Sequence, residues 1–401
     1  MWNLARVDKA VRDVLKFLQP PPVRIASLGE ALGMVAAEDV YSRVRLPPCP
    51  KATMDGYAVR SEDVEHAAPA SPAVLRLLPG RILPSQSPGV EVGAGECVAI
   101  DTGGYLPRGA DAVVEVEATA QLGDRVLVYR PVRPYENVSL PGEELEEGDP
   151  ILRRGDVVRP WHLSALEASG YESVSIYDLR AAAVYAGDEL VEGRWRPFTR
   201  WIVEGWLAEH SFKVVDSVVV GDDPGELRRV ISRALEEAHV VVVCAGSAVG
   251  PGDNSVRAVG ELHPEVQVRG MAIRPGKTTT ASVVGGRLVL NVSGLPVAAL
   301  SSLELFLKEL LRAWLGARFT RGPVVRARLA RRVTNKRGLR CFVRVRVYEE
   351  GGGLVAEPLM TGGSGSLRSL LLGNGVLIVP EDVEGFDEGE EVEVELYGPL
   401  G

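Results

Sequence analysis

The 401-residue chain is poor in cysteine and histidine, the side chains that build metal centres and covalent cross-links. Its four cysteines, at positions 49, 97, 244 and 341, lie far apart and form no Cys-x-x-Cys pair. This spacing indicates neither a zinc site nor a disulfide framework. The five histidines are scattered as well, so each reads as a surface or core residue rather than as a ligand.

Long apolar runs and an excess of positive charge are also missing. No run reaches the roughly 18 apolar residues that a membrane-spanning helix needs, and the N-terminus reads as an amphipathic, charged helix rather than a signal peptide. The net charge of −9 argues against a protein that binds nucleic acid or an acidic membrane, because such proteins carry a basic surface. We therefore expect a cytoplasmic protein with no nucleic-acid and no membrane partner.

What remains is an ordinary globular composition, with 46% hydrophobic and 25% charged residues, over a length that predicts two or three domains. A helix is expected over residues 3–18, and short strand-like runs separated by Gly and Pro over 73–130 predict a small β domain. From about residue 180, strands and helices alternate, which is typical of βαβ units with a mainly parallel sheet. The last 80 residues are β-like again.

One stretch stands out, the run from Val240 to Asn254. Four successive valines and Cys244 predict a strand buried on both faces, as in parallel sheets. Gly246, Gly250 and Gly252 follow, and glycines let backbone N–H groups approach an anion closely. The loop therefore reads either as a phosphate-type binding loop at the carboxyl edge of a sheet or as a plain connecting turn.

Charged residues follow several of the expected strands. Asp188 and Glu189 come just after a strand over 181–186, and Asp253 follows the valine run. Carboxylates beside a glycine-rich loop suit a Mg²⁺ ion that bridges phosphate oxygens. Arg274 and Lys277 are placed to supply positive charge for an oxyanion. The alternative is that each of these residues is a solvated loop charge.

Two further motifs are ambiguous by themselves. Asp55-Gly56 follows a Pro-rich loop and most often marks a turn, and Thr102-Gly103-Gly104 reads as a polar pocket wall or as a β-bulge. Gly276-Lys277-Thr278 is similar to the end of a P-loop, but the motif needs glycine at position 271, where the chain has Met. We reject that interpretation.

The motifs taken together resemble those of the MoeA / gephyrin E-domain family, the molybdopterin molybdenumtransferases. The resemblance covers nearly the whole chain and is carried, in the family's order, by Thr53-Met-Asp-Gly-Tyr-Ala-Val-Arg60, Asp101-Thr-Gly-Gly…Gly-Ala-Asp-Ala-Val-Val114, Ala186-Gly-Asp-Glu-Leu190, the 245–253 loop, Ala272-Ile-Arg-Pro-Gly-Lys277, and Gly-Ser-Gly-Ser-Leu…Gly-Val-Leu-Ile-Val-Pro380.

The resemblance implies an α/β and β multidomain fold. Its expected parts are a discontinuous N-terminal helical region over 1–44 and 137–177, a small β domain over 45–136, a MogA/MoaB-like α/β domain with a parallel sheet over 178–318, and a C-terminal β-barrel over 319–401. It also implies a homodimer whose site lies between the α/β domain of one subunit and the small β domain of the other.

The implied activity is the insertion of molybdate or tungstate into adenylylated molybdopterin, with Mg²⁺ as cofactor and with release of AMP. A MogA/MoaB-type adenylyltransferase is the implied protein partner. The implied catalytic residues are Asp55, Thr102, Glu189 and Asp253. The implied substrate-binding residues are Gly103, Gly246, Ser247, Gly250, Arg274, Lys277, Ser293 and Pro296. Asp188, Glu189 and Asp253 would hold the metal.

The sequence departs from the family pattern in several segments. Cys244-Ala-Gly246 stands where Ser-Gly-Gly is usual, Leu295 stands where Asn is usual, and segments 139–144 and 198–200 also differ. Because these positions bear on polar contacts to an anionic substrate, a second hypothesis is a non-catalytic, molybdopterin-binding carrier or scaffold. A third is a nucleotide-binding regulator that keeps only the ligand site of the α/β domain.

Overall fold

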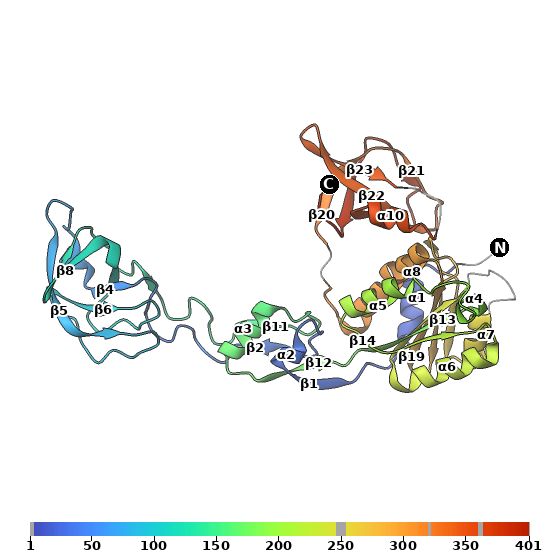
Figure 1. The fold of residues 1–401 in the computed structure, drawn as a ribbon, viewed down its shortest axis with the longest axis horizontal. Coiled ribbons are helices and arrows are strands. Elements are labelled where there is room, and N and C mark those ends of the chain that lie inside the picture. Colours follow the sequence, from blue (N-terminus) through green and yellow to red (C-terminus); the bar gives the residue numbers. More distant parts are fainter. Residues whose placement is uncertain (1–3, 246–253, 320–321, 360–363, 401) are drawn as a thin grey trace. The chain divides into compact units, whose positions relative to one another are not determined.

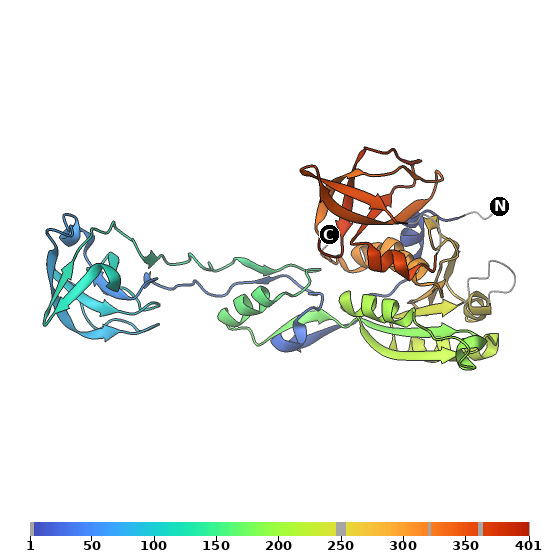
Figure 2. The ribbon, with the colours of Figure 1, turned by 45° about the horizontal axis from the view of Figure 1, so that its top comes forward.

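The computed structural model describes residues 4–245, 254–319, 322–359 and 364–400, and the chain divides into two compact units. Unit 1 comprises Met1–Glu38, Arg153–Arg159 and Ser173–Gly401, and unit 2 comprises Asp39–Leu152 and Pro160–Glu172. Figures 1 and 2 show that each unit has its own sheets. No helix in the described ranges has the length and apolar character needed to span a membrane.

Unit 2 is built on a six-stranded sheet in the order β7-β4-β6-β5-β9-β8. These strands are β4 (Gly56–Val59), β5 (Ala73–Ile82), β6 (Glu96–Ile100), β7 (Ala112–Glu115), β8 (Thr119–Leu122) and β9 (Arg125–Val128). β4 is buried along its whole length because it lies between β6 and β7. The remaining elements of the unit are β2 (Val40–Tyr41), β3 (Lys51–Ala52), η1 (Ser61–Val64), η2 (Val116–Ala118), β10 (Val138–Ser139), β11 (Pro150–Leu152) and α3 (Pro160–Ala168).

The α/β part of unit 1 has a six-stranded sheet in the order β14-β13-β15-β19-β18-β16. Its strands are β13 (Arg180–Ala186), β14 (Lys213–Val220), β15 (Val240–Ala245), β16 (Val266–Arg269), β18 (Thr280–Val284) and β19 (Arg287–Ser293). The first four strands of that order are parallel, and the β16–β18 and β18–β19 pairs are antiparallel. The predicted, mainly parallel sheet is confirmed, and β18 and β19 form a hairpin with Gly285-Gly286 at its tip.

Helices cover both faces of this sheet, which explains why strand β15 reads as an uninterrupted apolar run. Alternate residues of β15 belong to two separate cores, Val240 and Val242 to one and Val241 and Val243 to the other. One core is completed by α6 (Pro224–Glu237) and α7 (Asn254–Gly260). The other is completed by α1 (Val7–Leu15), α5 (Arg200–Glu209) and the continuous segment α8 (Pro296–Ser302), η3 (Leu303–Leu307) and α9 (Lys308–Leu315).

Helix α6 shows how local sequence sets these elements. Asp223 precedes the helix and its side chain accepts a hydrogen bond from the Glu226 N–H, while Pro224 occupies the first turn, where its missing N–H costs nothing. Leu227, Ile231 and the following apolar residues recur at helical spacing and are buried against the sheet.

Five strands of the C-terminal region close into a barrel. They are β20 (Val324–Leu329), β22 (Arg340–Glu350), β23 (Gly353–Pro358), β24 (Gly375–Val379) and β26 (Glu391–Leu396), and the pairing runs β22-β23-β20-β26-β24 and back to β22. Alternate apolar residues of these strands form its core. β17 (Ile273–Arg274) adds to β22 in parallel, and β21 (Val333–Thr334), β25 (Gly385–Phe386) and α10 (Leu367–Leu372) complete the region.

The rest of unit 1 is a short two-stranded sheet of β1 (Val23–Ser27) and β12 (Ser173–Tyr177), followed by α2 (Leu28–Ala31) and, near β13, by α4 (Asp188–Val191). Ser27 and Glu30 form a capping box at the start of α2. Helix α1 packs into the α/β core, although the sequence grouped residues 1–44 with 137–177. All four cysteines are free, and the predicted fold class is confirmed.

Candidate functional site

The Asp55 carboxylate and Thr102 are in direct contact in unit 2. The Thr102 backbone N–H donates to Asp55 Oδ1 at 2.7 Å, and the Thr102 hydroxyl donates to the same oxygen at 2.8 Å. These hydrogen bonds lower the pKa of Asp55 below its usual range, and the charge of Arg81 acts in the same direction. Asp55 is exposed to solvent and is therefore an ionised, accessible carboxylate at neutral pH.

Two glycines explain why this contact forms. A Cβ on Gly56 would lie 1.9 Å from the Val114 carbonyl oxygen, so only glycine permits the close approach of β4 to β7 directly after Asp55. Gly103 has φ +87°, a backbone conformation that favours glycine, and its N–H donates to the Ala52 carbonyl at 2.8 Å. The predicted Asp55, Thr102 and Gly103 thus form one cluster.

The carboxyl edge of the parallel sheet gathers a second set of predicted residues. In the register, Tyr185 lies beside Cys244, and Ala245 lies beside Ser293, so the chain leaves β13, β15 and β19 at the same edge. Asp188 and Glu189 follow β13, and Pro296 follows β19 as the first residue of α8. Strands 181–186 and 240–244 are parallel and end at one edge, as expected, and Asp188 and Glu189 follow there.

Two glycines make room for carboxylates at this edge. Asp188 Oδ1 accepts a hydrogen bond from the Asp222 N–H at 2.9 Å, and Asp222 Oδ2 accepts one from the Asp188 N–H at 3.3 Å. A Cβ on Gly221 would lie 2.9 Å from Asp188 Oδ1, and a Cβ on Gly187 would lie 2.5 Å from Glu189 Oε1. The strand ends are therefore shaped around these acidic side chains.

The donor set suits a hard divalent cation. Mg²⁺ is usually bound through one or two carboxylates plus substrate phosphates and water, and Asp188 and Glu189 supply two carboxylates in the space that the glycines leave. Within the described ranges, no group of three or more His, Cys, Asp or Glu side chains is arranged to hold a metal. The other predicted residues of this loop region, Gly246, Ser247, Gly250 and Asp253, lie outside the described residues.

A cavity of about 220 Å³ opens beside Glu189 at the same edge. Leu295, the departure from the family's Asn, lines it and is 40% exposed. Ser293 is buried, and its hydroxyl accepts the Leu295 N–H at 3.2 Å, while the Thr199 hydroxyl donates to the Gly294 carbonyl at 2.6 Å. The cavity has a mixed lining of aromatic, apolar and charged side chains, among them Tyr185, Trp195, Arg196 and Cys244.

Arg274 is the last residue of β17, and Lys277 lies in the turn that follows and packs on α8. A Cβ on Gly276 would lie 2.9 Å from Ser302 Oγ, and the Thr279 hydroxyl is 2.6 Å from the same atom. Both cationic side chains are exposed. Burial raises the pKa of the Cys341 thiol, and the positive charges of Arg274 and Lys277 oppose that rise.

The structure describes the predicted residues in three places. Asp55, Thr102 and Gly103 form one cluster in unit 2. In unit 1, the acidic edge with Ser293 and Pro296 is one place, and the segment of Arg274 and Lys277 is another. Sequence reasoning missed Asp222, although it follows strand β14 as directly as Asp188 follows β13. The same rule of residues after parallel strands would have found it.

The fold and these residues define a multidomain α/β protein with an ionised carboxylate on its small β domain and an acidic, glycine-lined edge on its parallel sheet. Three family models match the chain: MoeA N-terminal region (domain I and II) over residues 5–170, probable molybdopterin binding domain over 182–313, and MoeA C-terminal region (domain IV) over 326–397.

Similar proteins match over nearly the full length. A curated relative from Methanocaldococcus jannaschii, whose name assigns it to molybdopterin biosynthesis, is 33% identical over 93% of this chain and 92% of its own. The molybdopterin molybdenumtransferase of Staphylococcus aureus is 27% identical over 98% of this chain and 96% of its own. A crystal structure of a molybdopterin biosynthesis MoeA protein from Pyrococcus horikoshii superposes with a TM-score of 0.73 at 32% identity, covering 99% of this chain and 100% of the other. The chain belongs to the MoeA family.

Proposed function

We propose that this protein is a molybdopterin molybdenumtransferase, which inserts molybdate or tungstate into adenylylated molybdopterin and releases AMP. The observation that carries the proposal is the pair of residue clusters at the family's motif positions, the Asp55–Thr102 contact and the glycine-lined acidic edge. The near full-length likeness to proteins named molybdenumtransferases supports the reaction class.

The side chains divide the work by charge. Asp55 is held ionised by Thr102 and is suited to orient a polar group of the substrate as a hydrogen-bond acceptor. Arg274 and Lys277 are exposed cations suited to offset the charge of a molybdate or phosphate group. Asp188 and Glu189 would hold Mg²⁺, which when bound neutralises charge on phosphoanhydride oxygens.

The proposal includes a cytoplasmic homodimer and a MogA/MoaB-type adenylyltransferase that supplies the adenylylated substrate. The match of residues 182–313 to a molybdopterin binding domain supports a molybdopterin-related substrate, while the dimer and the partner rest on the family resemblance. Sedimentation of the purified chain would give the mass of the assembly, and a monomer at micromolar concentration would contradict the dimer.

The carrier hypothesis is not favoured, because the S. aureus relative that matches 98% of this chain is named as a transferase. The altered segments 139–144, 198–200 and 293–296 remain its only basis. The test below also distinguishes the carrier hypothesis: a carrier would bind adenylylated molybdopterin tightly and release no AMP.

The experiment mixes purified protein with adenylylated molybdopterin, Mg²⁺ and molybdate and measures AMP. We expect AMP release that requires molybdate or tungstate and that falls by about 10²- to 10⁴-fold in Asp55→Ala, because a positioned acid–base or charged group contributes on that order. The melting temperature of that variant should stay close to wild type, since Asp55 is exposed. If the wild-type protein releases no more AMP than a sample without protein, the proposal is wrong. If Asp55→Ala keeps full activity, Asp55 is not part of the site.

A further inference from the structure

The short loop that carries Asp55 is held by backbone hydrogen bonds at both ends. The Val116 N–H donates to the Asp55 carbonyl at 3.0 Å, directly after β7. Two residues before Asp55, the Thr53 N–H donates to the Asn137 carbonyl, also at 3.0 Å. The first bond lies at the end of the β4–β7 pair, and the second continues the pairing of β3 with β10. Asp55 lies between these two attachments, so the position of its carboxylate depends on where Asn137 is held.

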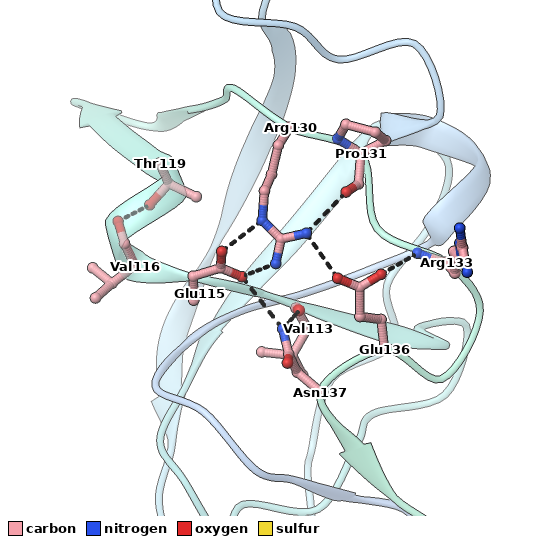
Figure 3. Close-up of polar contacts among 9 residues, drawn as sticks. All are labelled: Val113, Glu115, Val116, Thr119, Arg130, Pro131, Arg133, Glu136 and Asn137. Carbon is pink, nitrogen blue, oxygen red and sulfur yellow. Dashed lines mark hydrogen bonds and ion pairs between the residues drawn. The ribbon is translucent and has the colours of Figure 1, made fainter.

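Asn137 is fixed by its own side chain. Its Nδ2 donates to the Val113 carbonyl at 2.9 Å and to Glu115 Oε2 at 3.3 Å, so that the residue is fastened to β7 (Figure 3). The Val113 N–H donates in turn to the Glu136 carbonyl at 3.1 Å. Asn137 has φ +58°, a left-handed conformation that asparagine tolerates better than most residues.

Arg130 holds the carboxylate that Asn137 contacts. Its Nε and one terminal nitrogen donate to the two oxygens of Glu115, each at 2.6 Å, which is a bidentate ion pair. Its other terminal nitrogen donates to Glu136 Oε1 at 2.7 Å and to the Pro131 carbonyl at 3.2 Å (Figure 3). One guanidinium thus connects the end of β7 with the residue that precedes Asn137.

We propose that Asn137, clamped by the Arg130–Glu115 pair, is a positioning residue for the Asp55 carboxylate. It acts through the backbone: the clamp fixes the Asn137 carbonyl, the carbonyl fixes Thr53, and Thr53 fixes the loop in which Asp55 meets Thr102. The inference rests on the proposed function for its catalytic meaning, while its geometric part concerns the Asp55–Thr102 contact alone.

If Asn137 had only a structural role, it would stabilise the small β domain without affecting the Asp55–Thr102 contact. The test therefore measures that contact directly. The Thr102 amide donates to a carboxylate, and its proton shift and its exchange with solvent report on that hydrogen bond without any substrate. The probe is the full-length protein labelled with ¹⁵N-threonine at neutral pH.

The test variant is Asn137→Gly, which removes the side-chain amide, keeps the left-handed backbone accessible and changes no charge. We expect the Thr102 amide to exchange about tenfold faster or more, and its shift to move toward values of exposed loops. The matched control is Tyr135→Gly, which places glycine at another left-handed position of the same loop, φ +64°, outside the clamp. The control should leave the Thr102 signal unchanged.

Arg130→Lys is the second variant, because it keeps the charge but loses the bidentate fork. It should move the Thr102 signal in the same direction by a smaller amount, and it keeps the inference testable if Asn137→Gly does not fold. An unchanged Thr102 signal in either folded variant would overturn the inference.

The kinetic arm compares AMP release by the same proteins. We expect kcat to fall roughly ten- to a hundredfold in Asn137→Gly with the molybdate KM within about twofold of wild type, because a small misplacement affects the reacting geometry more than ground-state binding. A wild-type protein without activity counts against the proposed function only, since the amide measurement needs no turnover. An active wild type with unchanged kcat in Asn137→Gly counts against the inference only.

Discussion

Thr102 donates two hydrogen bonds, from its backbone N–H and from its hydroxyl, to a single oxygen of Asp55. Both bonds favour the ionised carboxylate, which is why the pKa of Asp55 is lowered although the side chain is exposed. The two residues lie 47 positions apart in the sequence. The segment that carries Thr102 therefore fixes the position of one oxygen of the Asp55 carboxylate.

Replacing the Thr102 hydroxyl should therefore change how activity depends on pH. In Thr102→Val one of the two donors is lost, the pKa of Asp55 rises, and activity should begin to fall at a higher pH as the solution is acidified. We expect kcat/KM at neutral pH to drop about tenfold, the usual scale for losing one hydrogen bond to a charged group. Thr119→Val is the control, since that hydroxyl donates to a backbone carbonyl, that of Val116. Coincident pH–rate profiles of the two variants would contradict the assignment.

The Gly187→Ala substitution should weaken the binding of Mg²⁺ that supports activity. The new methyl group would lie 2.5 Å from Glu189 Oε1 and must displace that carboxylate. We expect the Mg²⁺ concentration for half-maximal AMP release to rise by about tenfold. Gly205→Ala, in helix α5 with nothing within 4 Å of the new Cβ, should leave it unchanged and stabilise the protein by about 0.5–1 kcal/mol. An equal Mg²⁺ dependence in both would remove Glu189 from the metal set.

If the active site is shared between two copies of the chain, as the family resemblance implies, two inactive variants should complement each other. Asp55→Ala and Lys277→Ala should each be inactive. Asp55 lies in unit 2 and Lys277 lies in unit 1, so each variant loses a site residue from a different unit. If the homodimer combines residues from different copies, half of the dimers in an equilibrated equal mixture contain one copy of each variant. Each mixed dimer has one intact site of two, so the mixture should regain about a quarter of wild-type activity. Mixtures that stay inactive, although the subunits exchange, would show that each copy uses its own residues.

The Lys308 ammonium is the buried centre of an ion-pair network in unit 1. Its side chain is 8% exposed and lies 2.9 Å from Glu304 Oε2 and 3.5 Å from Glu395 Oε1, so it connects α9 with barrel strand β26. Lys308→Met removes this cation from two partly exposed carboxylates, which keep hydrogen bonds from the Trp206 indole and the Gly322 N–H. It should lower the free energy of unfolding by about 1.5–3 kcal/mol. Arg326→Met, which breaks pairs that are about 70% exposed, should change it by less than about 0.5 kcal/mol. Urea unfolding of both variants decides the comparison.

The His210 imidazole should make unit 1 sensitive to acid. The ring is buried, stacks on Trp206 at 3.7 Å between ring centroids, and burial lowers its pKa to about 4. Because the unfolded chain takes up this proton near pH 6.5, the contribution to stability is complete above pH 6.5 and is lost as the pH falls toward 4. Between pH 7 and 4.5 the loss should be roughly 2–3 kcal/mol, and His210→Gln should lack it. Equal acid-induced losses in urea unfolding would contradict this account.

Much of the fold followed from local patterns. The valine run of β15 predicted a strand buried on both faces, and the structure places its alternate residues in two cores. Pro224 and the apolar residues spaced at helical intervals after it are typical of the start of a helix, and Gly285-Gly286 is typical of a hairpin tip; the structure has both. These signals succeed because burial, capping and turn geometry act over a few residues.

The site followed only in part. Asp188 and Glu189 were predictable because parallel strands end at one edge, and Asp222 was predictable by the same rule. Asn137 was not, because its effect on Asp55 passes through a carbonyl and an ion pair that join separate parts of the chain. No spacing of residues in the sequence predicts a backbone contact that depends on an ion pair elsewhere in the chain.

The sequence by itself determined which strands are buried, where helices begin, and which glycines and carboxylates are available, since each depends on neighbours along the chain. Only the tertiary structure decided that Thr102 closes on Asp55 and that Gly187 and Gly221 make room for acidic side chains. Those contacts depend on strand register and on atoms approaching within about 3 Å, which packing across the whole unit sets.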